Sequence, residues 1–280
     1  MSMYHTHTYI INGDFDQSIS PLDRGFTYGD GVFRTMLMRS GLPVAWPLHY
    51  QKLVADCAAL GIVCPSADLL MADFLQLFSA QDIDSKKLDV AKIIISRGEG
   101  ERGYKTPAIT SPTRVVIRSA MPLYAKHYYS QGVQLHLCNT RLSKQAKLAG
   151  IKHLNCLDNI LARMEWRDES IFDGLMLDQA DNVIECTMSN IFARFGKVIV
   201  TPSLSECGVS GITRQRICNL APVLNLTVEM AQLRLDRILQ ADELIICNSL
   251  YGVFQVYKIN DTHWAQQNLA ETLRSLLAHD

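Results

Sequence analysis

Short β-prone segments joined by tight turns dominate the second half of the chain and most constrain its fold. Apolar segments at residues 174–177 and 183–185 flank a turn of small and polar residues, and those at 191–194 and 198–200 flank Gly196. Such pairs are typical of β-hairpins. Strands are also indicated at 133–138 and 242–250 by their β-prone, apolar composition. The pattern therefore predicts a sheet rich in hairpins in this half.

The first half mixes strands with two amphipathic helices. A strand at residues 9–11 ends in Asn12-Gly13, which is a hairpin-turn signal, and a glycine-rich loop then leads into a strand with Phe33 and Thr35 on one face. Further elements are predicted as helices at 49–60 and 67–80 and strands at 90–96 and 113–117, with a closing helix of the whole chain at 264–279.

Residues 119–129 change character, because Pro122 breaks a strand and a polar stretch follows. We therefore expect a smaller N-terminal α/β domain at 1–120, an interdomain linker at 121–130 and a larger C-terminal domain at 131–280. At 280 residues the chain is long enough for two domains or for one large α/β unit.

Charge and composition argue against several classes of partner. The 27 basic and 28 acidic side chains leave a net charge of −1 without long runs of either sign, so neither nucleic acid nor an anionic membrane is expected as a partner. The N-terminus lacks a secretory signal, and no apolar run has the length of a membrane span. The eight cysteines form no Cys-x-x-Cys pair. They are interpreted as buried free thiols in a reducing cytoplasm, ahead of disulfides or a metal site.

A literal nucleotide-binding motif, GEGERG at residues 98–103, has the wrong context. In a dinucleotide-binding unit this loop would open a helix. Here Pro107 and Pro112 prevent that helix, and a strand follows at 113–117, so the motif is interpreted as a hairpin loop.

This glycine-rich loop, which we call the arm (residues 98–105), carries Arg102, Tyr104 and Lys105. We expect the arm to be mobile and to bind a carboxylated ligand. Solvated loop charges are the simpler alternative.

A lysine stands at the entry to a predicted helix in the middle of the chain. Asn155 is the expected N-cap of this helix. Lys152 would then lie just outside the helix start, between apolar neighbours, where lost hydration and the helix dipole both lower its pKa. Such a lysine is suited to form a Schiff base, whereas an ordinary surface lysine is the alternative. The apolar stripe of the helix is formed by Leu154, Leu157, Ile160, Leu161 and Met164.

Glu185 ends an otherwise apolar strand, where a carboxylate can hold a pyridine nitrogen protonated. A rim-exposed hairpin glutamate is the alternative. Free N–H groups at the glycine-preceded helix start near Thr213 are suited to bind phosphate, together with the small polar residues Asn248 and Ser249. Lys52 can add a positive charge. Lysine, electron-sink carboxylate and phosphate cup are the requirements of pyridoxal phosphate.

Four motifs, in this order along the chain, resemble those of the fold-type IV pyridoxal-phosphate enzymes. That family includes branched-chain aminotransferases, D-amino-acid aminotransferases and aminodeoxychorismate lyases. The motifs are ING at 11–13, YGDGVF at 28–33, ECTMSNIF at 185–192 and GITR at 211–214. Within the family, AGIKHLN at 149–155 and RGY at 102–104 look most like the lyase branch.

The resemblance implies an α/β fold with a smaller N-terminal domain and a larger C-terminal domain that contains a barrel-like sheet. It implies a homodimer whose active site lies between the domains and receives a loop from the neighbouring subunit. Lys152 is implied as the Schiff-base lysine and Glu185 as the partner of the pyridine nitrogen. Lys52 stands where the family usually has arginine, so the charge is kept without the bidentate fork. The implied cofactor-binding residues are Lys52, Lys152, Glu185, Asn190, Ile212, Thr213 and Ser249.

The resemblance further implies conversion of 4-amino-4-deoxychorismate to 4-aminobenzoate and pyruvate, a step toward folate. Lys152 would move the protons, positioned by Thr35. The dicarboxylated substrate would be held by Thr35, Arg102, Tyr104 and Asn248. One alternative is an aminotransferase of the same fold acting on D- or branched-chain amino acids. Another is a cofactor-free binding or scaffold protein that keeps the fold.

Overall fold

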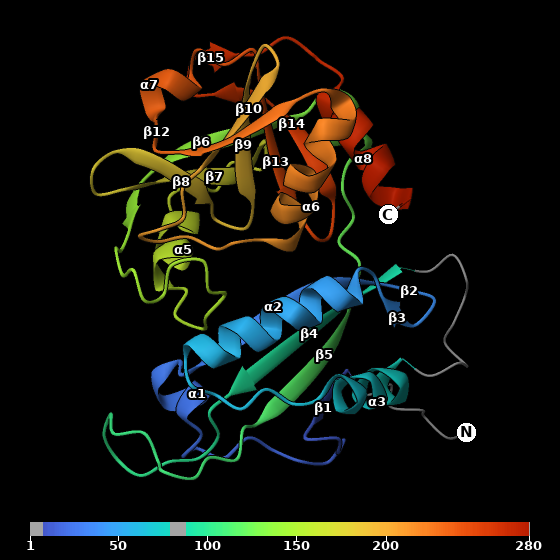
Figure 1. Ribbon diagram of the computed structural model, residues 1–280, viewed down its shortest axis with the longest axis vertical. Coiled ribbons are helices and arrows are strands. Elements are labelled where there is room, and N and C mark those ends of the chain that lie inside the picture. Colours follow the sequence, from blue (N-terminus) through green and yellow to red (C-terminus); the bar gives the residue numbers. More distant parts are fainter. Residues whose placement is uncertain (1–7, 79–87, 280) are drawn as a thin grey trace. The chain divides into compact units, whose positions relative to one another are not determined.

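The computed structural model describes residues 8–78 and 88–279, which fall into two compact units (Figure 1). The first unit takes in the described residues up to Pro122 together with Lys152–Asn155, and the second takes in Leu123–Ile151 and the chain from Cys156 onward. The stretch expected to be a linker contains the short helix α4 (Lys126–Ser130), which belongs to the second unit.

The first unit is a five-stranded antiparallel sheet with two helices on one face (Figure 1). The sheet has the strand order β1-β5-β4-β2-β3. The strands are β1 (Tyr9–Ile11), β2 (Gly31–Arg39), β3 (Leu42–Pro43), β4 (Leu88–Ser96) and β5 (Arg114–Ala120). The helices are α2 (Trp46–Ala59) and α3 (Ala67–Leu77). The helix predicted at 67–80 is confirmed to Leu77, and its last two residues lie outside the described residues.

Side-chain alternation along β2 places two sets of residues on opposite faces of the sheet. Val32, Arg34 and Met36 are buried, whereas Phe33 and Thr35 share the other face and are partly exposed, as predicted. The Asn12-Gly13 turn also has the predicted hairpin geometry, because both residues have positive φ angles, 52° and 88°.

A short helix, α1 (Arg24–Tyr28), interrupts the segment that was expected to be only a glycine-rich loop. The Asp23 carboxylate caps it by accepting hydrogen bonds from the N–H groups of Gly25 and Phe26. Gly29 ends the helix in the left-handed conformation, with φ 66°. The capping signals are present in the sequence, but five residues are too few to show helical periodicity.

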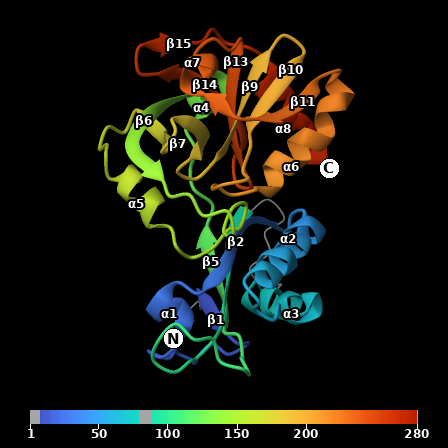
Figure 2. The same cartoon turned by 60° about the vertical axis from the view of Figure 1, so that its left-hand side comes forward.

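The second unit is built around a ten-stranded sheet with the order β11-β10-β9-β13-β14-β6-β7-β8-β12, and β15 pairs with β14 (Figure 2). β12, at one end of this order, lies against β10, which is near the other end, so the sheet is nearly closed into a barrel. The predicted α/β fold with a barrel-like sheet is thus confirmed, as are the hairpins β7–β8 and β9–β10. The first five strands are β6 (Val133–Leu142), β7 (Ile171–Asp178), β8 (Asn182–Cys186), β9 (Asn190–Phe195) and β10 (Val198–Pro202). The others are β11 (Thr227–Ala231), β12 (Leu233–Arg234), β13 (Glu243–Asn248), β14 (Gly252–Ile259) and β15 (Thr262–His263).

Helices cover the outside of this sheet. α6 (Ile212–Leu220) and α8 (Leu269–His279) pack on it through a core that includes Phe192, Ile217 and Leu273. The closing helix therefore begins at Leu269 rather than at Trp264. The short helix α7 (Leu235–Ile238) and the 3₁₀ turn η2 (Ala221–Leu224) complete the unit.

Helix α5 (Leu157–Arg163) differs from the prediction at its start. Cys156, not Asn155, is its N-cap residue and makes no side-chain capping hydrogen bond; the Asn155 amide instead donates to the carbonyl oxygen of Gly29 at 3.0 Å. Four of the five residues of the apolar stripe are exposed, whereas Leu154, which precedes the helix, is half-buried. The exposed fractions are 70% for Leu157, 54% for Ile160, 53% for Leu161 and 72% for Met164.

Two further predictions concern the arm and the cysteines. No helix follows the GEGERG motif, so its interpretation as a loop between β4 and β5 is confirmed.

All eight cysteines are free thiols and five of them are buried. Within residues 8–78 and 88–279, no helix is both long and apolar enough to cross a membrane.

Candidate active site

Lys152 lies at the beginning of β2 in the first unit. Its carbonyl oxygen accepts a hydrogen bond from the Phe33 N–H at 2.9 Å, and Leu154 donates to the carbonyl of Gly31 at 3.0 Å. These bonds add a short antiparallel segment to the free edge of β2. The Lys152 ammonium lies 4.6 Å from the centroid of the Phe33 ring. Helix α5 begins at Leu157, one residue later than predicted, so Lys152 precedes it in the sequence by five residues.

Asp56 of α2 binds the backbone N–H of Lys152 and forms ion pairs with two basic side chains. Its Oδ2 accepts the Lys152 N–H at 3.3 Å, and its carboxylate forms ion pairs with Arg34 and Lys52. Burial and the nearby Arg34 lower the pKa of Lys52 to about 7, whereas direct contact with Asp56 favours the protonated ammonium. The charge predicted to face a phosphate is therefore at least partly engaged within the first unit.

Thr35 lies on the same face of β2 as Phe33, and its cross-strand partner on β4 is Lys92. The Lys92 ammonium lies 4.9 Å from the Phe33 ring centroid. Sequence reasoning missed Lys92. The alternation of β4 contained the signal, because Lys92 is the one basic residue of this strand and lies between the buried residues Ala91 and Ile93.

Glu185 is a buried acid of β8 in the second unit, with 5% of its surface exposed. The alternative of a rim-exposed glutamate is therefore wrong. Its Oε2 accepts hydrogen bonds from the Val209 N–H at 2.8 Å and from the Asn190 amide at 3.4 Å. Asn190 also donates to the Val209 carbonyl at 2.8 Å and accepts from the Gly211 N–H at 3.1 Å. Asn190 thus links Glu185 to the start of α6.

The start of α6 has the features of a phosphate site. Gly211 is its N-cap residue, and no side chain caps the helix. A Cβ atom at Gly211 would overlap the Asn190 side chain, so the close approach requires glycine. The hydroxyl oxygens of Thr213 and Ser249 lie 3.4 Å apart. N–H groups at the first turn and two adjacent hydroxyls are suitable donors for a phosphate group.

Asp173, which was not identified from the sequence, stabilises the turn next to this site through hydrogen bonds. It is fully buried, and its carboxylate accepts hydrogen bonds from the hydroxyls of Thr187 at 2.6 Å and Ser189 at 2.7 Å. Burial raises the pKa of Asp173, although these hydrogen bonds act in the opposite direction. Tyr251 donates to the Ser189 hydroxyl at 2.6 Å. This network holds the turn that precedes Asn190.

The chain that leads to Lys152 is paired with the loop beside Glu185. Gly150 donates to the carbonyl of Gly208 at 2.8 Å, and Ser210 donates to the carbonyl of Gly150 at 3.1 Å. Val209, between them, is the residue whose N–H binds Glu185. Lys152 follows Gly150 by two residues in the sequence.

The predicted substrate-binding residues are placed differently. Arg102 and Tyr104 are exposed on the arm, Tyr104 to 86%. Asn248 ends β13, and its Oδ1 accepts hydrogen bonds from the N–H groups of Leu250 at 2.9 Å and Tyr251 at 3.2 Å. The second unit therefore brings together Glu185 and the start of α6, and the first brings together Lys152, Phe33 and the strand face that carries Thr35.

The chain is similar to a known family and to proteins of known structure. The family model of class IV aminotransferases matches residues 31–259. An aminodeoxychorismate lyase from Vibrio harveyi is 34% identical over 251 residues, which cover 89% of this chain and 90% of that protein. The crystal structure of 4-amino-4-deoxychorismate lyase from Pseudomonas aeruginosa matches with a TM-score of 0.90 and 35% identity, covering 97% of this chain and 98% of that chain. The branched-chain amino acid aminotransferase of Escherichia coli shares the fold with a TM-score of 0.86 at 19% identity, covering 97% of this chain and 93% of that chain.

Proposed function

The chain belongs to the class IV aminotransferase family, and we propose that it is a pyridoxal-phosphate-dependent lyase that converts 4-amino-4-deoxychorismate to 4-aminobenzoate and pyruvate. The observation that carries the proposal is likeness to two such lyases, at 34% and 35% identity, over nearly the whole chain. Glu185 is buried and is linked through Asn190 to the start of α6, and this arrangement supports the assignment of pyridoxal phosphate as the cofactor.

Bound pyridoxal phosphate supplies an aldehyde that takes up the substrate amine and a ring that accepts an electron pair. In this proposal Lys152 holds the aldehyde until substrate arrives. Glu185 keeps the ring nitrogen protonated, and the donors around Thr213 and Ser249 hold the phosphate. Lys52 is proposed to add its positive charge at the phosphate. Asn190 orients Glu185 through the hydrogen bonds described above.

Lys152 is proposed to move both protons of the reaction. Its free amine takes the proton from the amine-bearing ring carbon of the substrate. The bond between the ring and the enolpyruvyl ether oxygen then breaks, and the ring becomes aromatic. A proton delivered to the methylene carbon completes pyruvate, so no second substrate is consumed. Thr35, which lies on the same face of β2 as Phe33, is proposed to position the Lys152 amine.

The substrate carries two carboxylates, and the first unit has two basic residues, Arg102 and Lys92, that suit them. Arg102 and Tyr104 on the exposed arm are proposed to bind one of them. Lys92, beside Phe33, is a further candidate, because it shares the strand face of Thr35. Asn248 is proposed to contribute its amide.

The experiment that tests this function supplies 4-amino-4-deoxychorismate, generated in place from chorismate, to the purified enzyme with pyridoxal phosphate. We expect 4-aminobenzoate and pyruvate in equal amounts, without any added keto acid. Parallel reactions offer D-alanine or L-leucine with 2-oxoglutarate. Rapid transamination without 4-aminobenzoate would show that the chain is an aminotransferase instead.

We also propose that the enzyme is a homodimer, with the exposed face of α5 in its interface. Leu157, Ile160, Leu161 and Met164 recur at helical spacing and are each more than half exposed. A contiguous apolar face of this kind is typical of an association surface.

The dimer proposal is tested by Leu161→Glu, which places a charge in the centre of that face. We expect the wild type to be dimeric by light scattering and the variant to be monomeric with nearly unchanged circular dichroism. Val223→Glu, on a valine of η2 that is 68% exposed, is the matched control and should remain dimeric. A wild type that is monomeric, or a Leu161→Glu variant that stays dimeric, would contradict the assignment.

A cytoplasmic location is part of the proposal. Eight free thiols are retained in the chain, five of them buried. Free cysteines at this number are typical of a reducing compartment.

A further inference from the structure

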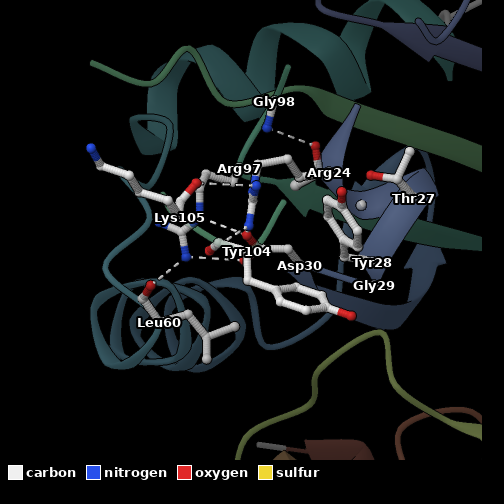
Figure 3. Close-up of polar contacts among 12 residues, drawn as sticks. Arg24, Thr27, Tyr28, Gly29, Asp30, Leu60, Arg97, Gly98, Tyr104 and Lys105 are labelled. Atoms are coloured by element: carbon white, nitrogen blue, oxygen red, sulfur yellow. Dashed lines mark hydrogen bonds and ion pairs between the residues drawn. The ribbon is translucent and has the colours of Figure 1, made fainter. Parts of the chain in front are cut away.

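Arg24 of α1 is tied to the backbone of the arm rather than to solvent. The residue is only 4% exposed. Its Nη1 donates to the carbonyls of Gly103 at 3.0 Å and Lys105 at 3.5 Å, and its Nη2 donates to that of Tyr104 at 3.3 Å (Figure 3). A single guanidinium thus contacts three consecutive carbonyls of the arm. These hydrogen bonds attach the backbone of the arm at residues 103–105 to α1.

Tyr28, one turn further along α1, makes the second set of contacts with the arm. Its hydroxyl accepts a hydrogen bond from the Gly103 N–H at 3.1 Å. Its ring lies 5.5 Å from that of Tyr104, centroid to centroid, and 5.0 Å from the Arg24 guanidinium carbon. Tyr28 and Arg24 together engage both the N–H and the carbonyl of Gly103.

Asp30 holds Arg24 in the orientation that reaches the arm. Its carboxylate accepts the Arg24 Nε–H at 2.9 Å and also binds Arg97 at 2.7 Å and 3.0 Å. Burial alone would raise the pKa of Asp30, but hydrogen bonds and charge attraction from Arg97 and Arg24 lower it. Arg97 makes its other hydrogen bonds to the carbonyls of Leu60 and Gly61, not to the arm.

The GEGERG motif is explained by this packing. A Cβ atom at Gly100 would lie 2.8 Å from Cδ of Arg24, which is closer than van der Waals contact allows. The Arg24 N–H donates to the carbonyl of Gly98 at 2.8 Å, and Gly100 donates to that of Leu22 at 3.2 Å. The glycines allow the arm to lie against α1, as Figure 2 also shows for the two segments.

We infer that Arg24 is a positioning residue, which fixes the arm's backbone so that Arg102 and Tyr104 present their side chains to the substrate carboxylates. The inference rests on the proposed function, in which these two residues bind substrate. Arginine suits this role because its five donors form a rigid fork, whereas lysine keeps the charge but not the fork. A backbone that is already ordered spares the enzyme the cost of ordering it when substrate binds.

Arg24→Lys tests the inference, with Arg97→Lys as the matched control. Both variants keep a cation beside Asp30, but only Arg24→Lys loses contacts with the arm. For Arg24→Lys we expect KM for 4-amino-4-deoxychorismate to rise about tenfold, a loss of one order of magnitude in binding, with kcat changed by less than about twofold. For Arg97→Lys we expect a nearly unchanged KM. An equal KM in both variants would overturn the inference.

Adding Arg24→Lys to the double variant Arg102→Ala, Tyr104→Ala separates positioning from general stability. If Arg24 acts through these two residues, the triple variant should have nearly the KM of the double variant. A further rise in KM as large as that of Arg24→Lys alone would contradict the inference, because it would mean that Arg24 acts independently of Arg102 and Tyr104.

Limited proteolysis reads the arm without any assay of activity. Trypsin cleaves after Arg102, which directly precedes the carbonyls that Arg24 binds, and after Lys105, whose own carbonyl is one of them. We expect cleavage at these sites to be several-fold faster in Arg24→Lys than in the wild type or Arg97→Lys. Equal rates would overturn the inference even if the wild type is a lyase. If Arg24→Lys is cleaved faster but the wild-type enzyme has no lyase activity, only the proposed function is refuted. If Arg24→Lys does not fold, Tyr28→Phe must show faster cleavage, and an unchanged rate there overturns the inference.

Discussion

Lys152→Arg is expected to reduce kcat by roughly 10³-fold or more, because arginine stays protonated and cannot form a Schiff base or accept the substrate proton. The fold should survive, since Lys152 is held through its backbone N–H by Asp56 and through its carbonyl by Phe33. Steady-state turnover and thermal unfolding measure the two effects separately. Lys147→Arg, on an exposed lysine of the same segment, is the control and should retain normal turnover. A nearly normal kcat for Lys152→Arg would refute its role.

Glu185→Gln is expected to reduce kcat by roughly 10²-fold while the enzyme still binds pyridoxal phosphate. Glutamine keeps an oxygen that can accept the Val209 N–H, so the loop should stay in place. It lacks the negative charge that keeps the ring nitrogen protonated, so the ring becomes a poorer electron sink. The measurement is turnover at saturating cofactor, with the absorbance of bound cofactor recorded in parallel.

Glu206→Gln provides the matched control for this variant, because Glu206 is an exposed glutamate in the loop that leads to Val209. Its turnover should equal that of the wild type. Wild-type turnover in a folded Glu185→Gln enzyme would show that the carboxylate does not act on the ring.

Local signals predicted much of the secondary structure because turn chemistry and alternation act over a few residues. Asn12-Gly13 and Gly196 marked two turns, and the alternation around Phe33 gave the correct faces of β2. The cap of α5 could not be predicted in this way. Asn155 has the right side chain for a cap, but its amide is recruited by the carbonyl of Gly29, 126 residues away. Helical periodicity likewise predicts a stripe on α5 without saying what covers it.

The candidate site shows the same division between local and distant information. An acid ending an apolar strand and a glycine before a helix could be recognised separately in the sequence. Their connection through Asn190 depends on tertiary contacts that no local pattern indicates, and the family resemblance implied Asn190 only as a cofactor-binding residue. Arg24 carried no local signal at all, because the carbonyls it binds lie 79 to 81 residues further along the chain. Asp173 and Lys92 each lie in the interior of a mostly apolar strand, and an interior charged residue of this kind was recognised in the sequence only for Glu185.

In the proposed mechanism, Lys152 bonds to the cofactor that Glu185 and the start of α6 also hold. Borohydride reduction of the enzyme loaded with pyridoxal phosphate makes that bond permanent, and peptide mass mapping then locates it. We expect one pyridoxyl group per chain, on the peptide that contains Lys152, and no such group in Lys152→Arg. A pyridoxyl group on Lys144 or Lys147 instead of Lys152 would show that Lys152 does not carry the cofactor.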